Sequence, residues 1–394
     1  MKTSPANTKA QKSVYIRVVL YSLLSSITAY IHSSYMIAAG LTQSQIDSIY
    51  IMLSVCGIIG VWFLAIRRRS IASFAKMIIG LVLLLCASLA AINWTIDPRL
   101  LVPAIFILLG LESPLFFIFD ELLEHATTDS STAKTRSIYL AFQNAAWIIA
   151  PLIGFILIER STNLGIAYTA GLVLGAILLT YSIYSISHVR QEQTKTLTTN
   201  KAFNPHVLPA IYSHFILQLF YACMISIVPV YMNSELGWSW TQVGVTIALA
   251  LTAFPIIQIP LGRLLDKHHI EKRIMPVALI IMGLSIIAFV SQQHSAIIAI
   301  PMLAFFFTRV GAAALEVSNE SYIFRHIDYT HRTTIALFRS LSPLSYLFVP
   351  LFWLIISLSS MQSLILTTAI FILLNSIFVI GLFGFRNTLQ SITK

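Results

Sequence analysis

Residues 262–291 read GRLLDKHHIEKRIMPVALIIMGLSIIAFVS, and this stretch contains the pattern that decides the fold. A short segment rich in basic residues ends at Arg273, and a long run without any charged side chain follows it. An α-helix rises about 1.5 Å per residue, so about 20 apolar residues cross the roughly 30 Å hydrocarbon core of a bilayer. Residues 273–291 are therefore predicted to form a transmembrane helix.

The whole chain has the composition of a membrane protein. Of its 394 residues, 57% are hydrophobic and only 10% are charged, and the mean hydropathy is +0.83. A soluble domain carries about 25% charged residues. The alternating ten-residue segments of an outer-membrane barrel are absent from the sequence. The composition predicts an all-α integral membrane protein.

Apolar blocks of the same kind recur along the chain and predict twelve transmembrane helices. The expected spans are 14–38, 44–66, 72–93, 100–124, 136–158, 164–187, 206–233, 241–264, 273–291, 295–322, 332–358 and 361–385. The longest polar interruption, at 188–205, separates two groups of six. We therefore expect a tail at 1–13, a six-helix bundle at 14–187, a cytoplasmic linker at 188–205, a second six-helix bundle at 206–385 and a tail at 386–394.

Basic residues indicate the orientation of the chain. All but four of the 25 Lys and Arg residues fall on the side of the N-terminus in this topology. The exceptions are Arg99 and Arg160 on the opposite side, and Arg309 and Arg339 inside spans. Cytoplasmic loops of membrane proteins are enriched in Lys and Arg. Both termini are therefore predicted to be cytoplasmic, and the short loops favour a bacterial inner membrane.

Several other classes of function are disfavoured. The net charge of +10 is spread over the loops and forms no basic stripe of the kind that binds nucleic acid. The cluster Asp120-Glu121-x-x-Glu124-His125 contains metal-type ligands but has no second histidine pair. The three cysteines lie in apolar blocks without paired spacing. We expect no metal, no cofactor, no catalytic residues and a monomer that is not an enzyme.

The two halves of the sequence resemble each other weakly. Four residues of the first half recur 196 positions later with the same chemistry: Asp120, Glu124, Arg136 and Phe142 correspond to Glu316, Glu320, Arg332 and Phe338. Six helices repeated in the same orientation form a parallel repeat, with its axis along the membrane normal. The predicted fold is two pseudo-symmetric six-helix bundles.

The loop motif Gly262-Arg263-Leu264-Leu265-Asp266-Lys267, with the tail Glu271-Lys272-Arg273, resembles the Gly-x-x-x-Asp-Arg/Lys signature of the major facilitator superfamily of secondary transporters. The resemblance covers nearly the whole chain and implies twelve helices and transport by alternating access. It also implies that Asp266 locks one gating state. The stretch at 64–69, where the family shows the motif most strongly, reads LAIRRR and has neither the glycine nor the aspartate.

Charged residues inside the predicted spans are the candidate functional residues, because a charge in lipid is costly unless it faces a cavity or a partner. Arg309, Glu316 and Glu320 share one helix face by their spacing. Arg309 and Glu112 lie near mid-depth, so they could pair in an empty state, bind the two ends of a zwitterion or form a structural ion pair. The candidates for substrate binding or proton coupling are Glu112, Asp120, Arg309 and Glu316.

A second group of charges lies toward the cytoplasmic ends of the spans. Resemblance to the family implies that the fourth and fifth helices close against the tenth and eleventh on this side. We therefore predict a cytoplasmic gate made of acid–arginine pairs between the halves. Its residues are Asp266, Arg136, Arg332, Arg339 and Glu320.

The sequence thus predicts secondary active transport of a small solute, with proton coupling as a hypothesis. The expected partners are the solute, protons and membrane lipid, and nucleic acid is not expected. The alternatives are a non-transporting sensor or scaffold on the same fold, or an intramembrane enzyme. Neither the substrate nor the direction of transport follows from the sequence.

Overall fold

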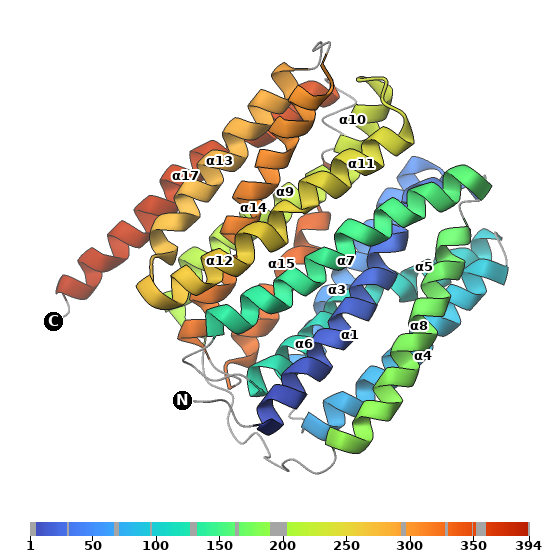
Figure 1. Ribbon diagram of the computed structural model, residues 1–394, viewed down its shortest axis with the longest axis horizontal. Coiled ribbons are helices and arrows are strands. Elements are labelled where there is room, and N and C mark those ends of the chain that lie inside the picture. Colours follow the sequence, from blue (N-terminus) through green and yellow to red (C-terminus); the bar gives the residue numbers. More distant parts are fainter. Residues whose placement is uncertain are drawn as a thin grey trace. The chain divides into compact units, whose positions relative to one another are not determined.

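The computed structural model describes residues 5–29, 31–66, 71–94, 97–126, 132–161, 165–189, 203–292, 297–327, 330–348, 350–351 and 360–392. Within these ranges every element is a helix (Figure 1), so the predicted all-α class is confirmed. The segments 67–70 and 190–202, which include the predicted basic loop and most of the predicted linker, lie outside the described residues.

The part of the chain before the predicted linker forms eight helices. They are α1 (Pro5–Ala29), α2 (His32–Ala38), α3 (Gln43–Ile66), α4 (Ile71–Trp94), α5 (Pro98–Gly110), α6 (Glu112–His125), α7 (Thr132–Ser161) and α8 (Ile166–Val189).

The part after the linker begins with a 3-10 turn, η2 (Pro205–Val207). The helices that follow are α9 (Leu208–Ser226), α10 (Val228–Ser234), α11 (Trp240–Leu251), α12 (Ala253–His268), α13 (Glu271–Ser291), α14 (Ala299–His326), α15 (Arg332–Tyr346) and α17 (Met361–Ile392).

Among the described residues, ten helical segments are long and apolar enough to cross a membrane. They coincide within a few residues with ten of the twelve predicted spans. The other two predictions correspond to α1 with α2 and to α15, and residues 352–359 at the end of the predicted eleventh span lie outside the described part. The helices are therefore consistent with twelve spans, and the chain is a multi-pass membrane protein.

In the described part of the chain, four spans predicted as single helices are interrupted. The first is divided between α1, which ends at Ala29, and α2, which begins at His32. The fourth is divided at Leu111, the seventh at Ile227 and the eighth at Thr252. Pro229 lies in the first turn of α10, and Pro255 lies just after Thr252. A proline has no amide hydrogen to donate and its ring clashes with the preceding turn, so a helix breaks or bends there. The predicted spans rest on the length of each apolar block, and a break in the helix does not interrupt the apolar block.

The chain divides into two compact units. Unit 1 comprises Met1–Thr128, Ala146–Phe203 and Asp328–Leu347, and unit 2 comprises Asp129–Ala145, Asn204–Ile327 and Phe348–Lys394. The units differ from the contiguous halves of the sequence, because α15 belongs to unit 1 and the first part of α7 belongs to unit 2. The division into contiguous six-helix bundles stays a prediction.

In unit 1, α8 packs against α1 and α4, and α15 packs against α3 and α6. Small residues allow close approach between these helices. A Cβ atom added at Gly57 would lie 3.4 Å from Cβ of Pro343, and one added at Gly60 would lie 2.9 Å from Cγ of Pro114. The position of α15 beside α6 brings segments together that are far apart in the sequence.

In unit 2, α14 is the central helix and packs against α9, α11, α12 and α13 (Figure 1). α17 packs against α13 and α9. Gly311 of α14 lies against α13, where an added Cβ atom would be 2.6 Å from Cγ of Met282 and 2.8 Å from the Ala278 carbonyl oxygen. This contact of helix backbones fixes the register of α14, which carries several of the candidate site residues.

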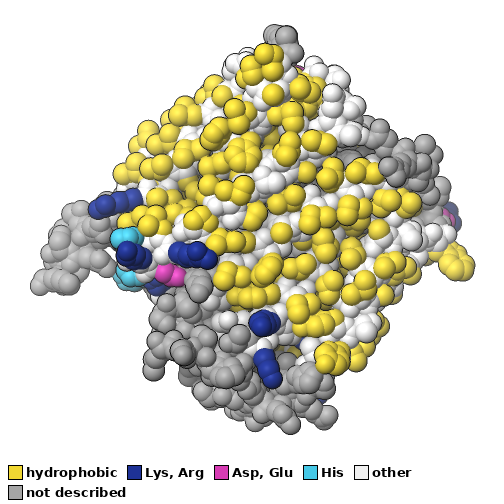
Figure 2. All heavy atoms as spheres, in the orientation of Figure 1, with side chains coloured by type: hydrophobic (Ala, Val, Ile, Leu, Met, Phe, Trp, Pro, Cys, Tyr) yellow, Lys and Arg dark blue, Asp and Glu magenta, His cyan; other side chains and the backbone are white. Residues whose placement is uncertain are grey.

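The outer surface is apolar, as a lipid-facing surface must be. Figure 2 shows hydrophobic side chains over most of the visible face, with charged side chains gathered near its edges. Exposed large hydrophobic residues include Ile59, Leu83, Val277, Leu284 and Ile377. A soluble protein rarely exposes apolar patches larger than a few hundred Å². The surface therefore matches the membrane assignment made from composition.

We expect Gly311→Ala to lower the stability of the purified protein by about 1–3 kcal/mol, because the new methyl group meets backbone atoms of α13. Gly80→Ala in α4 is the matched control, since its Cβ would meet nothing within 4 Å. Thermal unfolding in detergent measures both. Equal melting temperatures for the two variants would contradict the close packing of α14 on α13.

Candidate functional site

An ion pair between Asp120 and Arg339 joins α6 to α15 in unit 1. Asp120 is fully buried, and Nε and Nη2 of Arg339 donate to its two carboxylate oxygens. The distance from Nη2 to Oδ1 is 2.8 Å. Two parallel hydrogen bonds from one guanidinium form the strongest arrangement for an arginine and a carboxylate. Of the predicted gate and coupling residues, these two are brought into direct contact.

A second pair, one residue along α6, uses the start of α15. Nε of Arg332 lies 3.4 Å from Oε2 of Glu121, and both side chains are buried. The guanidinium carbon of Arg332 also lies 5.5 Å from the centre of the Phe74 ring. Arg332 is one of the predicted gate residues, whereas its partner Glu121 was not predicted to belong to the gate. No group of residues suited to hold a metal ion occurs in the described part of the chain.

The third pair lies in unit 2, between α7 and α14. Nη1 of Arg136 is 3.9 Å from Oε2 of Glu320, and each side chain is 1% exposed. The guanidinium carbon of Arg136 lies 3.5 Å from the centre of the Phe324 ring, one helical turn beyond Glu320. A cation over an aromatic face gains electrostatic attraction, and the gain is larger when water is excluded. The predicted gate residues Arg136 and Glu320 are therefore neighbours.

The internal repeat holds only approximately at these pairs. Arg136 contacts Glu320, so exact repetition would place Arg332 against Glu124. Arg332 contacts Glu121, about one turn earlier on α6 than Glu124. The repeat therefore predicts which helices are joined by an acid–arginine pair, and local packing determines which acid the arginine contacts.

Glu316 has neutral hydrogen-bond donors around it in unit 2. Nε2 of Gln258 on α12 donates to Oε2 of Glu316 at 2.7 Å, and Nδ2 of Asn144 on α7 donates to the same oxygen at 3.4 Å. The Asn144 amide also lies 3.3 Å from Oε1 of Gln258. Glu316 is half-buried, while Gln258 is fully buried. Three helices thus meet at one carboxylate.

Arg309, two turns before Glu316 on the same helix, is held by aromatic rings. Its guanidinium carbon lies 5.0 Å from the ring centres of Phe220 and Phe305, and the residue is 4% exposed. Seven residues of helix separate Arg309 from Glu316 by about 10 Å along the axis. A buried cation and a half-buried carboxylate on one face of α14 are suited to bind a polar solute.

Glu112 lies in unit 1, in the first turn of α6 directly after the break at Leu111. The side chain of Ser25 on α1 is a hydrogen-bond partner of its carboxylate. The break therefore places the Glu112 carboxylate at a helix N-terminus. Arg309 belongs to unit 2, and the predicted pairing of Glu112 with Arg309 stays a prediction.

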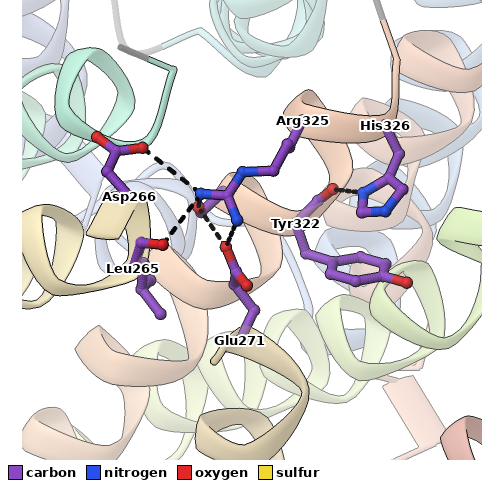
Figure 3. A network of polar contacts seen from close by, with 7 residues as sticks. Leu265, Asp266, Glu271, Tyr322, Arg325 and His326 are labelled. Atoms are coloured by element: carbon purple, nitrogen blue, oxygen red, sulfur yellow. Dashed lines mark hydrogen bonds and ion pairs between the residues drawn. The ribbon is translucent and has the colours of Figure 1, made fainter. Parts of the chain in front are cut away.

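Asp266, from the predicted loop motif, belongs to a network centred on Arg325 of α14 (Figure 3). Nη2 of Arg325 lies 3.5 Å from Oδ1 of Asp266 and 3.2 Å from the Leu265 carbonyl oxygen. Nη1 of Arg325 donates to Glu271, which also accepts from the Ser321 hydroxyl at 3.1 Å. One arginine thereby joins the end of α12 to the start of α13. Asp266, predicted to lock one gating state, thus contacts an arginine of α14, and its role in gating stays a prediction.

Sequence reasoning missed three residues of these clusters: Glu121, Gln258 and Arg325. Gln258 had a readable signal, since it is the one amide in an otherwise apolar stretch between Ala253 and Leu261. Arg325 was counted only as a cytoplasmic charge. No sequence spacing links Arg325 to Glu271 or Asp266, because the contact depends on how α14 packs beside α12 and α13.

Removing one partner of the Asp120–Arg339 pair should be costly, because it leaves a charge buried alone. We expect Arg339→Gln to destabilise the protein by about 3–5 kcal/mol, and Asp120→Asn in the same background to restore part of this loss. A double-mutant cycle on unfolding in mixed micelles measures the coupling energy.

The pair Arg136 and Glu320 is the comparison in the same assay. Its single ion contact at 3.9 Å should give a smaller coupling than the two hydrogen bonds of Asp120 and Arg339. Zero coupling between Asp120 and Arg339 would show that the pair does not hold α6 to α15.

Comparisons with known proteins extend these findings. The family model described as Major Facilitator Superfamily matches residues 210–391. Among solved structures, the human organic anion transporter MFSD10 (TETRAN) is similar, with a TM-score of 0.74 and 12% sequence identity. The match covers 96% of this chain and 100% of that one. No curated protein sequence matches the chain.

Two structures of a bacterial homologue of the iron transporter ferroportin, both in an outward-facing state, are also similar. One, with soaked iron, has a TM-score of 0.70 and 11% identity, and the match covers 94% of this chain and 98% of that one. The other has a TM-score of 0.66 and 12% identity, and the match covers 94% and 99%. At these identities the likeness shows the fold. The family match covers residues 210–391, and the structural likeness shows that the fold of this chain is similar to that of these transporters.

Proposed function

We propose that the protein is a secondary active transporter that moves a small solute by alternating access, with proton coupling through Glu316. The observation that carries the proposal is the set of buried acid–arginine pairs: Asp120–Arg339, Glu121–Arg332 and Arg136–Glu320. Each pair joins a helix before the predicted linker to one after it. The match of residues 210–391 to the Major Facilitator Superfamily model supports transport as the general function.

The pairs have the strength that a reversible gate requires. Two unit charges about 4 Å apart attract by about 4 kcal/mol at an effective dielectric constant of about 20, before the cost of desolvation is subtracted. Two conformations that differ by a few kcal/mol can be biased by such a term without being locked. Breaking the pairs would open the cytoplasmic side, and forming them would close it.

The surroundings of the acids support different roles for Asp120 and Glu316. Asp120 is fully buried and receives two hydrogen bonds from the guanidinium of Arg339, which suits a contact that holds α6 to α15. Glu316 is half-buried and accepts from the neutral amides of Gln258 and Asn144, which can reorient when the carboxylate takes up a proton. Glu316 is therefore the stronger candidate for coupling, and Asp120 for gating.

The solute is proposed to carry an anionic group that binds Arg309. The guanidinium between Phe220 and Phe305 offers a cation beside aromatic surface, which suits an organic acid with an apolar part. The human protein MFSD10, which has a similar fold, is an organic anion transporter, and this is consistent with the proposed substrate class. A zwitterion whose cationic end meets Glu316 fits the same face of α14.

A proton-flux assay tests the proposal. Purified protein in proteoliposomes with a pH-sensitive dye inside is given amino acids, sugars, organic acids or cationic dyes. We expect organic acids or zwitterions to trigger proton flux, and Glu316→Gln to reduce this flux at least tenfold while substrate exchange persists. Asp120→Asn should slow both flux and exchange, because it weakens the gate.

The exposed carboxylate of Glu235 provides the matched control, and Glu235→Gln should behave as the unmodified protein. Proton flux that persists in Glu316→Gln would reject Glu316 as the coupling residue, whereas substrate exchange without proton flux in the unmodified protein would favour a uniporter. If no compound is exchanged or drives flux, the non-transporting sensor becomes the better explanation.

A further inference from the structure

The loop between α12 and α13 presents a cluster of cations on the surface of unit 2. Arg263, Lys267, Lys272 and Arg273 are all exposed, and we call them the basic patch. His269 has a left-handed backbone conformation with φ of 52°, which ends α12, so that α13 begins two residues later. This turn brings the cations from the end of one helix close to those at the start of the next.

The two acids of the same loop are bound by an arginine of α14. Glu271 is 2% exposed and is bound by Arg325 and Ser321. Asp266 is partly buried and lies against the same arginine (Figure 3). Both acids are thus compensated internally. The outer side of the loop keeps its four positive charges. The loop residues 262–273 include no further acid that could neutralise them.

Local structure adds to the attraction for anions. The amino terminus of α13 points its free amide groups toward this loop, and a helix N-terminus favours negative charge. The ammonium group of Lys272 lies 5.8 Å from the ring centres of both Tyr322 and Phe383. These contacts restrict the side chain and reduce the entropy that ligand binding would cost.

Apolar surface continues directly from the patch on both helices. On α13, Arg273 is followed along one helix face by Val277, Ile280 and Leu284, which are 51%, 38% and 55% exposed. On α12, Arg263 and Lys267 follow Ile256, which is 59% exposed, on one face. Figure 2 shows Lys, Arg and His side chains at the border of the hydrophobic surface. A ligand that fits this surface has an anionic head and an apolar tail.

We propose that the basic patch binds an anionic phospholipid of the adjacent leaflet. The phosphate-containing headgroup contacts Arg263, Lys267, Lys272 and Arg273, and the acyl chains lie along the exposed apolar faces of α12 and α13. The charges favour an anionic lipid such as phosphatidylglycerol over a zwitterionic one of the same chain length. The neighbouring apolar faces favour a lipid over a soluble phosphate, which has no tail to bury.

Lipid titration followed by native mass spectrometry tests the proposal on the full-length protein in detergent. Dioleoyl phosphatidylglycerol and dioleoyl phosphatidylcholine are the two probes. Each cation near an anionic lipid contributes about fivefold in affinity. We therefore expect the variant Arg263→Gln, Lys267→Gln, Lys272→Gln, Arg273→Gln to bind phosphatidylglycerol at least tenfold more weakly, with phosphatidylcholine binding unchanged.

The matched control removes four other exposed cations, Lys9, Lys12, Lys76 and Arg99, by the same change to Gln. It should retain phosphatidylglycerol binding within twofold. Equal losses in both variants would mean a response to net charge and would overturn the proposal, as would unchanged binding in the patch variant. Displacement of the lipid by millimolar inorganic phosphate would point to a soluble anion and would also overturn it.

Two further measurements separate a local effect from unfolding. The single changes Lys267→Gln and Arg273→Gln, each at an exposed position, should weaken binding about fivefold without lowering the melting temperature. Exchange of Arg for Lys and Lys for Arg at all four positions keeps the charge and should keep the affinity within about threefold. Loss of binding in this charge-conserving variant would contradict an electrostatic site.

Discussion

A charge in hydrocarbon is tolerated only where it is paired, hydrogen-bonded or placed against a cavity, and the architecture of both units depends on this constraint. The spans carry few ionised groups, and the buried ones lie at helix contacts. Asp120 and Glu121 of α6 bind arginines of α15. Arg136 at the start of α7 binds Glu320 of α14. These pairs hold together helices that are far apart in the sequence, because each charge is more stable beside its partner than in the hydrocarbon. Apolar packing alone would be weaker in specifying these neighbours, since a lipid chain packs against leucine as well as another helix does.

The same physics that stabilises these contacts makes them reversible. An acid–arginine pair in water loses little when it separates, whereas a pair in a dry contact loses much, so its strength depends on how much water reaches it. A conformational change that admits water would weaken the pairs and favour further separation. Aromatic rings beside Arg136, Arg309 and Arg332 supply a second, less directional partner for the guanidinium. These rings can stabilise an arginine that has left its acid, which reduces the energy difference between the paired and separated states.

The sequence was sufficient for the fold class, because a run of about 20 apolar residues has few structures open to it other than a transmembrane helix. It was also sufficient for the identity of most charged candidates, since a charged residue in such a run is conspicuous. It did not predict the partners. The contact between Arg332 and Glu121 does not follow from the repeat, and the contacts of Arg325 with Asp266 and Glu271 depend on a packing arrangement with no sequence period. The helix breaks at Leu111 and Thr252 were missed for a similar reason, because hydropathy measures apolarity and not backbone continuity.

The two copies of the approximate repeat differ in the hydrogen-bond partners of one equivalent acid. Asp120 and Glu316 are equivalent positions, yet Asp120 is bound by Arg339 while Glu316 accepts from Gln258 and Asn144. The position equivalent to Arg339 is Gln143, next to Asn144. A duplicated acid has therefore diverged through its partner: a permanent cation at one copy and neutral amides at the other. The guanidinium of Arg339 can only donate hydrogen bonds, whereas an amide such as that of Gln258 or Asn144 can turn to offer either a donor or an acceptor to Glu316. In the proposed transporter this asymmetry assigns closure to one copy and proton exchange to the other, a division of roles that two identical copies could not provide.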